Sequence, residues 1–200
     1  MSIEEMTETG LKPVISLRDR VHTLASRVVA VDVAFFRMLA ALAIPKSVSW
    51  PLVVIVRIGD GYIWAIIGFT LWLALPLPEL LRTVLHCVLA IGVSLCIYLP
   101  IKLLVKRPRP FDGGMDVTPL VPPLDKYSFP SGHTMNNLAV AMTLSVHFPR
   151  LMVPAMAFPV ALGMLRILFG VHYLSDILGG TLLGIAAFFI ANAIFPTLPL

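Results

Sequence analysis

A short turn, Phe129-Pro130-Ser131-Gly132-His133, places a titratable ring directly ahead of a long apolar run. Pro130 cannot sit inside a helix, whereas Ser131 and Gly132 suit the N-terminal boundary of one. A helix that starts here directs unpaired backbone N–H groups and its positive dipole end at whatever lies in front, which suits an anion such as phosphate. A plain helix cap beside a surface histidine explains these five residues equally well.

A second candidate for chemistry is the pair His172 and Asp176, four residues apart. On a helix this spacing puts both side chains on one face, so the carboxylate can reach the ring. A carboxylate at one ring nitrogen fixes the tautomer and raises the basicity of the other nitrogen. This pair therefore has the pattern that a basic or nucleophilic histidine requires.

Three cations, Lys102, Arg109 and Arg166, lie near the ends of apolar runs. Arginine suits bidentate contact with phosphate, and three positive charges suit a dianionic or trianionic group. Each cation taken singly is also explained as a snorkelling side chain or as half of a helix-end ion pair. The sequence offers no acidic cluster with the spacing of metal ligands, which fits a reaction that uses no metal or other cofactor.

The composition indicates a membrane protein. Of the 200 residues, 58% are hydrophobic and 13% are charged, whereas a soluble domain is about half apolar and a quarter charged. This length accommodates roughly five or six spans of about 20 residues. The predicted fold is an all-α polytopic membrane helix bundle. We assign the net charge of +4 to basic residues that face anionic lipid head groups, not to nucleic acid binding.

The N-terminal part differs from the rest in polarity. We expect residues 1–23 to form a polar tail and residues 24–200 to form a single membrane-embedded domain. Residues 24–44 are apolar but interrupted by Asp32 and two arginines. Charges inside a span are costly, so this segment is either an interfacial helix or a marginal span, and we favour the interfacial interpretation.

Further along the chain, Arg57-Ile58-Gly59-Asp60-Gly61 is expected to break the chain at the level of the lipid head groups. The proline-rich segment 106–130 predicts an ordered but irregular loop. In the last apolar run, Gly180 and Gly184 have the spacing that lets membrane helices approach closely. The apolar runs predict spans at about 61–75, 80–105, 133–148, 151–171 and 176–195.

This order of spans brings the candidate residues to one membrane face. Lys102 and Arg109 leave the span 80–105 on the side where His133 begins the next span. The span that begins at His133 crosses to the opposite side of the membrane, and the next span crosses back. The third group of candidate residues therefore lies on the same side as the first two groups. That group consists of Arg166, His172 and Asp176. Ionisable residues near the membrane are candidates for a functional site.

Three motifs in this order resemble those of the type 2 phosphatidic acid phosphatase superfamily. They read Lys102-LLVKRP-Arg109-Pro110, then Pro130-Ser131-Gly132-His133, then Arg166-ILFGV-His172-YLS-Asp176. The alternative register Arg107-Pro108 has Pro100, not a lysine, at the matching upstream position. The resemblance covers about residues 50–195, with one departure. Leu165 stands where the family usually has a small residue.

The resemblance implies metal-independent phosphoryl transfer. His172 would attack phosphorus to give a phosphohistidine, and Asp176 would orient it. His133 would protonate the leaving oxygen and later activate water. The phosphate oxygens would be held by Lys102, Arg109, Arg166, Ser131 and the Gly132 backbone.

The position of the site also bears on the substrate. A site at the membrane face suits a lipid whose phosphate lies in the head-group layer, such as a polyprenyl diphosphate, phosphatidylglycerol phosphate or phosphatidic acid. In size the chain resembles small bacterial members that recycle undecaprenyl diphosphate. We therefore expect a lipid phosphate phosphatase in the bacterial inner membrane. With five spans the N-terminal tail and the site share a side, and the Lys/Arg excess there argues for the cytoplasm. If residues 24–44 span the membrane, the site faces the extracytoplasmic side, as is usual in the family that the motifs resemble, and we favour this orientation. The expected partners are its substrate and membrane lipids, and the oligomeric state is left open.

Two alternatives remain at this point. A lipid phosphotransferase would use the same phosphohistidine but pass the phosphoryl group to another lipid. A non-enzymatic anion channel or transporter would require polar residues that continue to the opposite membrane face, and in this sequence they stop near one side.

Overall fold

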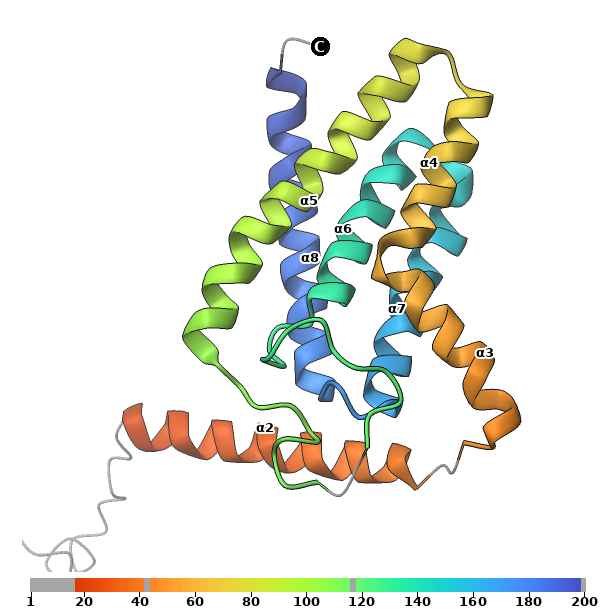
Figure 1. Cartoon of the computed structure of the whole chain (residues 1–200). Helices are drawn as coiled ribbons and strands as arrows, with labels where there is room; N and C mark the ends of the chain where they lie inside the picture. Colours follow the sequence, from red (N-terminus) through yellow and green to blue (C-terminus); the bar gives the residue numbers. More distant parts are fainter. Residues whose placement is uncertain (1–16, 42–43, 116–117, 199–200) are drawn as a thin grey trace, which may run out of the picture.

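The structure is a computed structural model of the chain and describes residues 17–41, 44–115 and 118–198. Every regular element in these ranges is helical, which confirms the all-α prediction. The α-helices are α2 (Leu17–Ala40), α3 (Lys46–Arg57), α4 (Ile63–Ala74), α5 (Leu77–Val105), α6 (Gly132–His147), α7 (Met152–Leu168) and α8 (Leu174–Ile194). Shorter helical pieces are η1 (Ile58–Tyr62), η2 (Pro149–Leu151) and η3 (Phe195–Thr197). Figure 1 shows α3 to α8 as a bundle with α2 across one end.

Four helical stretches within the described residues are long and apolar enough to cross a membrane. They are Ser47–Ala74, Leu77–Val105, Pro149–Leu168 and Leu174–Thr197. The prediction of an integral membrane protein is therefore confirmed. The predicted span 133–148 corresponds to α6, which has 16 residues and is shorter than the other four.

Helix α6 forms the centre of the bundle. It packs against α5, α7 and α8, and most of its residues are buried. Met135 and Ala139 of α6 lie in one apolar cluster with Ala90 of α5 and Ala187 of α8. Because it is enclosed on several sides, α6 holds its first turn in a fixed position relative to the ends of its neighbours.

The contact between α6 and α8 depends on two glycines. A Cβ atom on Gly180 would lie 2.6 Å from the backbone oxygen of Ser131, and one on Gly184 would lie 2.8 Å from that of Met135. Real side chains do not approach backbone oxygens so closely. The predicted close approach at these two positions is therefore confirmed, and it brings α8 directly against the start of α6.

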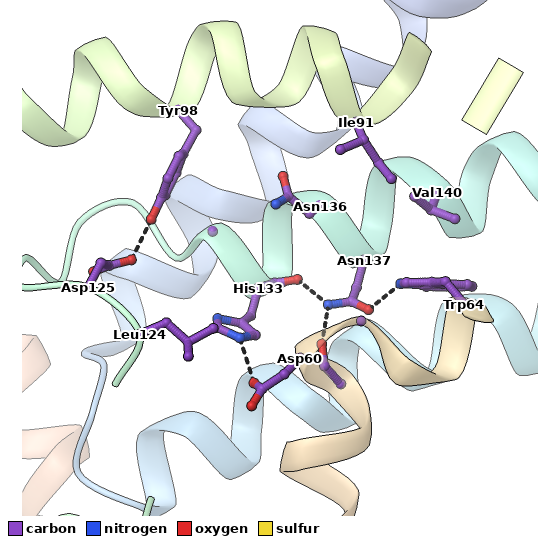
Figure 2. A pocket seen from close by; sticks show the side chains of 13 residues that line it. Asp60, Trp64, Ile91, Tyr98, Leu124, Asp125, His133, Asn136, Asn137 and Val140 are labelled. Carbon is purple, nitrogen blue, oxygen red and sulfur yellow. Dashed lines mark hydrogen bonds and ion pairs between the residues drawn. The ribbon is translucent and has the colours of Figure 1, made fainter. Parts of the chain in front are cut away.

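A break does occur in the expected segment. Gly61 has a φ of +124°, so its backbone is not helical, and it forms a kink between α3 and α4. The apolar stretch continues across this kink from Ser47 to Ala74, so the prediction that the span starts near residue 61 is wrong. The kink turns Asp60 toward the interior of the bundle, as Figure 2 shows.

Helix α2 lies across the end of the bundle in Figure 1 and contacts α7 and α8. It is not among the four candidate spans of the described residues. Its placement in the membrane interface stays a prediction. Residues 17–23 of the predicted polar tail belong to α2, and residues 1–16 lie outside the described part of the chain.

Candidate active site

A cavity of about 250 Å³ lies beside the first turns of α6. Its wall is formed by the η1 kink, α4, α5, α6 and the loop between α5 and α6, as Figure 2 shows. The polar side chains in this wall belong to Asp60, Trp64, Tyr98, Asp125, His133, Asn136 and Asn137. Gly132 also lines the cavity, and Ser131 and Gly132 are buried, so the predicted phosphate-binding turn faces this cavity and is not a surface cap.

Two of the predicted phosphate ligands, Lys102 and Arg109, converge on Asp125 of the α5–α6 loop. Lys102 Nζ donates to Asp125 Oδ2 at 2.7 Å, and Arg109 Nη2 donates to Asp125 Oδ1 at 2.6 Å. Tyr98 donates its hydroxyl hydrogen to Asp125 Oδ2 at 2.5 Å. Burial opposes ionisation of Asp125, but the hydrogen bonds from Lys102 and Tyr98 outweigh it and lower the pKa of Asp125 to about 2.

The third predicted cation, Arg166, meets His133 through Asp60. Arg166 Nη2 donates to Asp60 Oδ1 at 2.5 Å, and His133 Nε2 donates to the same oxygen at 2.8 Å. Arg166 is buried, and its Nε has no hydrogen-bond partner. A buried donor without a partner is costly unless a ligand satisfies it, so Arg166 retains a donor for an anion.

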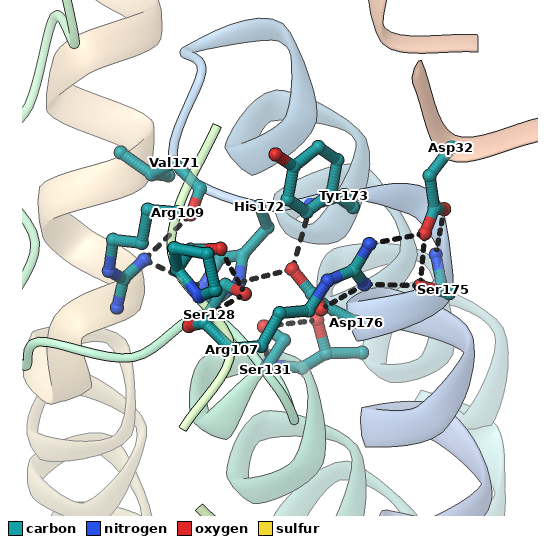
Figure 3. Close-up of polar contacts among 12 residues, drawn as sticks. Asp32, Arg107, Arg109, Ser128, Ser131, Val171, His172, Tyr173, Ser175 and Asp176 are labelled. Carbon is teal, nitrogen blue, oxygen red and sulfur yellow. Dashed lines mark hydrogen bonds and ion pairs between the residues drawn. The ribbon is translucent and has the colours of Figure 1, made fainter. Parts of the chain in front are cut away.

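The predicted pair of His172 and Asp176 lies between α7 and the first turn of α8. His172 Nδ1 is 3.4 Å from Asp176 Oδ2 and forms no hydrogen bond in the resting site. On the other side of the ring, Arg109 Nη1 lies 3.4 Å from His172 Nε2. A guanidinium only donates, so Nε2 is the unprotonated nitrogen and Nδ1 carries the proton. Figure 3 shows His172 between Arg109 and Asp176.

His172 is almost entirely buried, and this burial lowers its pKa to about 4 although Asp176 acts in the opposite direction. The ring is therefore neutral at physiological pH and keeps a lone pair on Nε2. His172 does not belong to the wall of the cavity, whereas Asp125 and His133 do. Arg109, which lies beside His172 Nε2, also binds Asp125.

The turn before α6 is fixed to α8 by its backbone. Ser131 is the N-cap of α6, and its side chain accepts from the Thr134 N–H at 3.4 Å. The Ser131 N–H donates to the backbone oxygen of Asp176 at 3.0 Å. The prediction that α6 begins at this turn is confirmed. The structure thus brings all eight predicted site residues to one end of the bundle, in contact with one another directly or through Asp60 and Asp125.

Sequence reasoning missed a buried ion network that surrounds Asp176. Arg107 Nη1 donates to Asp176 Oδ1 at 2.9 Å, and its Nη2 donates to Asp32 Oδ2 at 2.7 Å. Asp32 also accepts from the backbone N–H and the hydroxyl of Ser175. Figure 3 shows this chain of contacts from α2 to the start of α8. The tandem Arg107-Pro108-Arg109-Pro110 could have indicated this network, because a second arginine at the end of a membrane span needs an acidic partner of its own.

Two further residues of the site were also not predicted. Asp60 was assigned to a head-group break, and Asp125 was not singled out in the proline-rich loop. Leu165, the departure from the family pattern, packs beside an apolar cluster that contains Val56 and Val121. Within the described residues, His, Cys, Asp and Glu side chains form no group of three that could hold a metal ion.

The fold and site define an integral membrane protein whose helical bundle carries a cation-rich pocket with two histidines at one end. The sequence model of the PAP2 superfamily matches residues 83–199. The chain belongs to this superfamily, which confirms the resemblance found in the three motifs.

Comparison with individual proteins agrees with this assignment. The chain is 36% identical to phosphatidylglycerophosphatase B of Bacillus subtilis over 103 residues, which cover 46% of this chain and 48% of that protein. The matched part thus spans about half the length of this relative. A crystal structure of a transmembrane PAP2 type phosphatidylglycerolphosphate phosphatase from Bacillus subtilis superposes with a TM-score of 0.66 at 25% identity, covering 86% of this chain and 88% of that one. The structure of LpxE from Aquifex aeolicus gives a TM-score of 0.68 at 25% identity, covering 82% and 95%.

Proposed function

We propose that this protein is a metal-independent lipid phosphate phosphatase that works through a phosphohistidine at His172. The observation that carries the proposal is the environment of His172 Nε2. This unprotonated nitrogen lies 3.4 Å from Arg109 Nη1, an arginine that is already bound to an anionic group. A nucleophile next to an anion-binding arginine is the arrangement that phosphoryl transfer requires.

In the first step, the lone pair of His172 Nε2 forms a bond to phosphorus while the bond from phosphorus to the lipid oxygen breaks. The bond electrons go to that oxygen, which takes a proton from His133. The Nδ1 proton of His172 stays on the ring and faces Asp176, so the carboxylate stabilises the positive charge that develops. The products of this step are the free lipid and the phosphohistidine.

In the second step, His133 takes a proton from a water molecule, and the water oxygen attacks phosphorus. The bond between phosphorus and Nε2 breaks, and its electrons return to the ring as the original lone pair. Inorganic phosphate leaves and His133 is protonated again. His133 thus acts as general acid and then as general base.

The cations hold the phosphate oxygens through both steps. Lys102 and Arg109 contact an anionic carboxylate at hydrogen-bond distance in the resting site, so their donors are already oriented for an anion. Arg166 contributes its unpartnered Nε, and Ser131 with the Gly132 backbone completes the cradle at the start of α6. Donors fixed before the reaction stabilise the charge that spreads over the oxygens in the transition state.

A lipid substrate is supported by the apolar space beside the cavity. A pocket between α4, α5 and α6 shares Trp64, Ile91 and Val140 with the wall of the polar cavity. Apart from Thr83 its lining is apolar, so it suits a hydrocarbon chain whose phosphate lies at His133. Among lipid phosphates we favour phosphatidylglycerol phosphate, since this is the group named in the matched Bacillus subtilis proteins.

For the cellular location we propose the inner membrane of a bacterium, with the site on the extracytoplasmic side. The four apolar helices support membrane integration. The site lies at the end of the bundle that α2 crosses in Figure 1, so protease accessibility of a tag at the opposite C-terminal end measures the orientation. A cytoplasmic site would place that tag outside.

The direct test is phosphate release by the protein purified in detergent with EDTA present. We expect hydrolysis of one or more lipid phosphates from a panel of phosphatidylglycerol phosphate, phosphatidic acid and a polyprenyl diphosphate. His172→Ala removes the nucleophile and should lower kcat/KM at least about a thousandfold. His22→Ala, an exposed histidine on α2, serves as the control and should match the wild type.

Failure of the wild type to release phosphate from any of these lipids contradicts the proposal. So does a His172→Ala variant with wild-type turnover. Transfer of the phosphoryl group to an added lipid alcohol in preference to water would favour the phosphotransferase alternative.

A further inference from the structure

Asp60 connects two residues of the site that come from different helices. Its Oδ1 accepts from His133 Nε2 at 2.8 Å and from Arg166 Nη2 at 2.5 Å. The Asp60 side chain is only 9% exposed, and it forms part of the cavity wall. A carboxylate that is nearly buried and shared between a histidine and an arginine fixes the orientation of both.

The backbone around Asp60 is built to hold it in this position. A Cβ atom on Gly59 would lie 2.6 Å from Leu162 of α7, and Gly61 has a φ of +124°. Glycine therefore provides a close approach on one side of Asp60 and a left-handed backbone conformation on the other. An ordinary α-helix through these residues would provide neither.

Asn137 braces the kink against the turn that carries His133. Its Nδ2 donates to the backbone oxygen of Gly59 at 3.2 Å and to that of His133 at 2.8 Å. Trp64 Nε1 in turn donates to Asn137 Oδ1 at 2.7 Å. Figure 2 shows these contacts next to the hydrogen bond between His133 and Asp60. The distance between Asp60 and His133 is thus fixed by backbone contacts as well as by the side chains.

The hydrogen bond determines which ring nitrogen of His133 is available. Nε2 is held by Asp60, so the proton for the leaving group has to come from Nδ1. A histidine that donates from Nδ1 while Nε2 keeps its own hydrogen is a positively charged imidazolium. The charged groups around this ring are Asp60 on the kink, Arg166 on α7 and Asp125 on the loop, and Asp60 is the one bonded to it.

We propose that Asp60 is the positioning residue of His133, as Asp176 is of His172. The inference rests on the proposed phosphatase function and assigns a role within it. Asp60 accepts the Nε2 hydrogen and stabilises the imidazolium before the leaving group is protonated. As the bond from phosphorus to the lipid oxygen breaks, the Nδ1 proton moves to that oxygen, and the neutral ring keeps its bond to Asp60. Nδ1 then takes the proton of the attacking water.

The test compares two leaving groups. An alkyl phosphate such as phosphatidic acid needs protonation of its leaving oxygen, whereas p-nitrophenyl phosphate releases a stabilised phenolate and does not. In Asp60→Asn we expect turnover of the alkyl phosphate to fall about a hundredfold or more, while turnover of p-nitrophenyl phosphate falls less than about tenfold. The basic limb of the pH–rate profile for the alkyl phosphate should move to lower pH, because the imidazolium loses its anionic partner.

Two other variants complete the design. His133→Ala should show the same contrast between leaving groups, and adding Asp60→Asn to it should have little further effect. Asp112→Asn removes an exposed acid from the α5–α6 loop and should leave both substrates and the pH profile unchanged. Asp60→Ser replaces Asp60→Asn if the latter is not monodisperse.

An equal loss for both leaving groups with an unmoved pH profile overturns the inference, because it would mean that Asp60 acts only by holding Arg166. Failure of both Asp60 variants to fold overturns it as well, since the residue would then be structural. In either case turnover by the wild type leaves the proposed phosphatase function standing.

Discussion

The three cations that we propose as phosphate ligands are bound to carboxylates in the resting protein. Lys102 and Arg109 share Asp125, and Arg166 is bound to Asp60. Asp60 is 9% exposed, but the side chain of Asp125 is 35% exposed and belongs to the irregular loop before α6. Asp125 is therefore the more accessible of the two carboxylates, and its low pKa keeps it charged throughout the physiological range. We propose that a phosphate entering the site displaces Asp125 from Lys102 and Arg109.

Asp125→Asn should accordingly bind inorganic phosphate more tightly than the wild type. The amide forms weaker bonds to Lys102 and Arg109 than the carboxylate does, so we expect the dissociation constant to fall at least about tenfold. Thermal stabilisation of the purified protein by added phosphate measures this without any turnover. Weaker binding in the variant would mean that Asp125 orients the two cations and does not compete for them.

The motif residues could be predicted from the sequence because their spacing along the chain carries the signal. His172 and Asp176 are four positions apart, and His133 directly follows its turn. The expected placement of the pair on one helix is wrong, because His172 precedes the first residue of α8, but the two side chains still lie close together. Asp60 carries no such signal, since its partners His133 and Arg166 are 73 and 106 positions away. In the sequence, a single acid between two glycines indicates a break at the membrane surface. Only the contacts of Asp60 with His133 and Arg166 in the folded protein identify it as part of the site.

The helices position the site through the contact between α6 and α8. Gly180 lets the first turns of α8 lie against Ser131, and the Ser131 N–H is bonded to the Asp176 backbone. The segment with His172, the proposed nucleophile, and the turn before α6, the proposed phosphate-binding turn, are therefore held together by one helix contact. The spacing of Gly180 and Gly184 predicted a close helix approach along this span, but not that the neighbour is the start of α6. The sequence could not predict that the span continues across the kink to Ser47, because Arg57 and Asp60 interrupt the apolar run there.

Gly180→Ala should consequently affect both stability and catalysis. The added methyl group meets the Ser131 backbone oxygen at 2.6 Å, and overpacking of this kind costs about 1–3 kcal/mol. We expect a lower Tm together with a reduced kcat, because α8 must move away from the turn that carries His133. Gly92→Ala is the matched control, since a Cβ atom there has no neighbour within 4 Å. Equal behaviour of the two variants in detergent would contradict this role of the contact.

For the molecule as a whole, the polar network and the apolar surface are separated. The ion pairs of the site lie at one end of the bundle, and the contact between His86 and His147 lies near the other end, beside Phe195. Long apolar faces on α4, α5 and α8 remain exposed in the isolated chain, as expected for helices that face lipid. The network from Asp32 through Arg107 to Asp176 further joins α2 to the same end. This separation supports the proposal that a lipid reaches the site with its phosphate at the membrane surface while its chains stay in the bilayer.

The central claim is that His172 becomes phosphorylated, and trapping that intermediate tests it most directly. Protein mixed with a lipid substrate labelled with ³²P in its phosphate should carry the label after rapid denaturation. A phosphohistidine is stable to alkali and labile to acid, and peptide mapping should place the label at His172. The label should accumulate in His133→Ala when the substrate has a good leaving group, because water attack is slowed, and should be absent from His172→Ala. An unlabelled but active wild-type enzyme under these conditions, or a label that persists in His172→Ala, would contradict the mechanism.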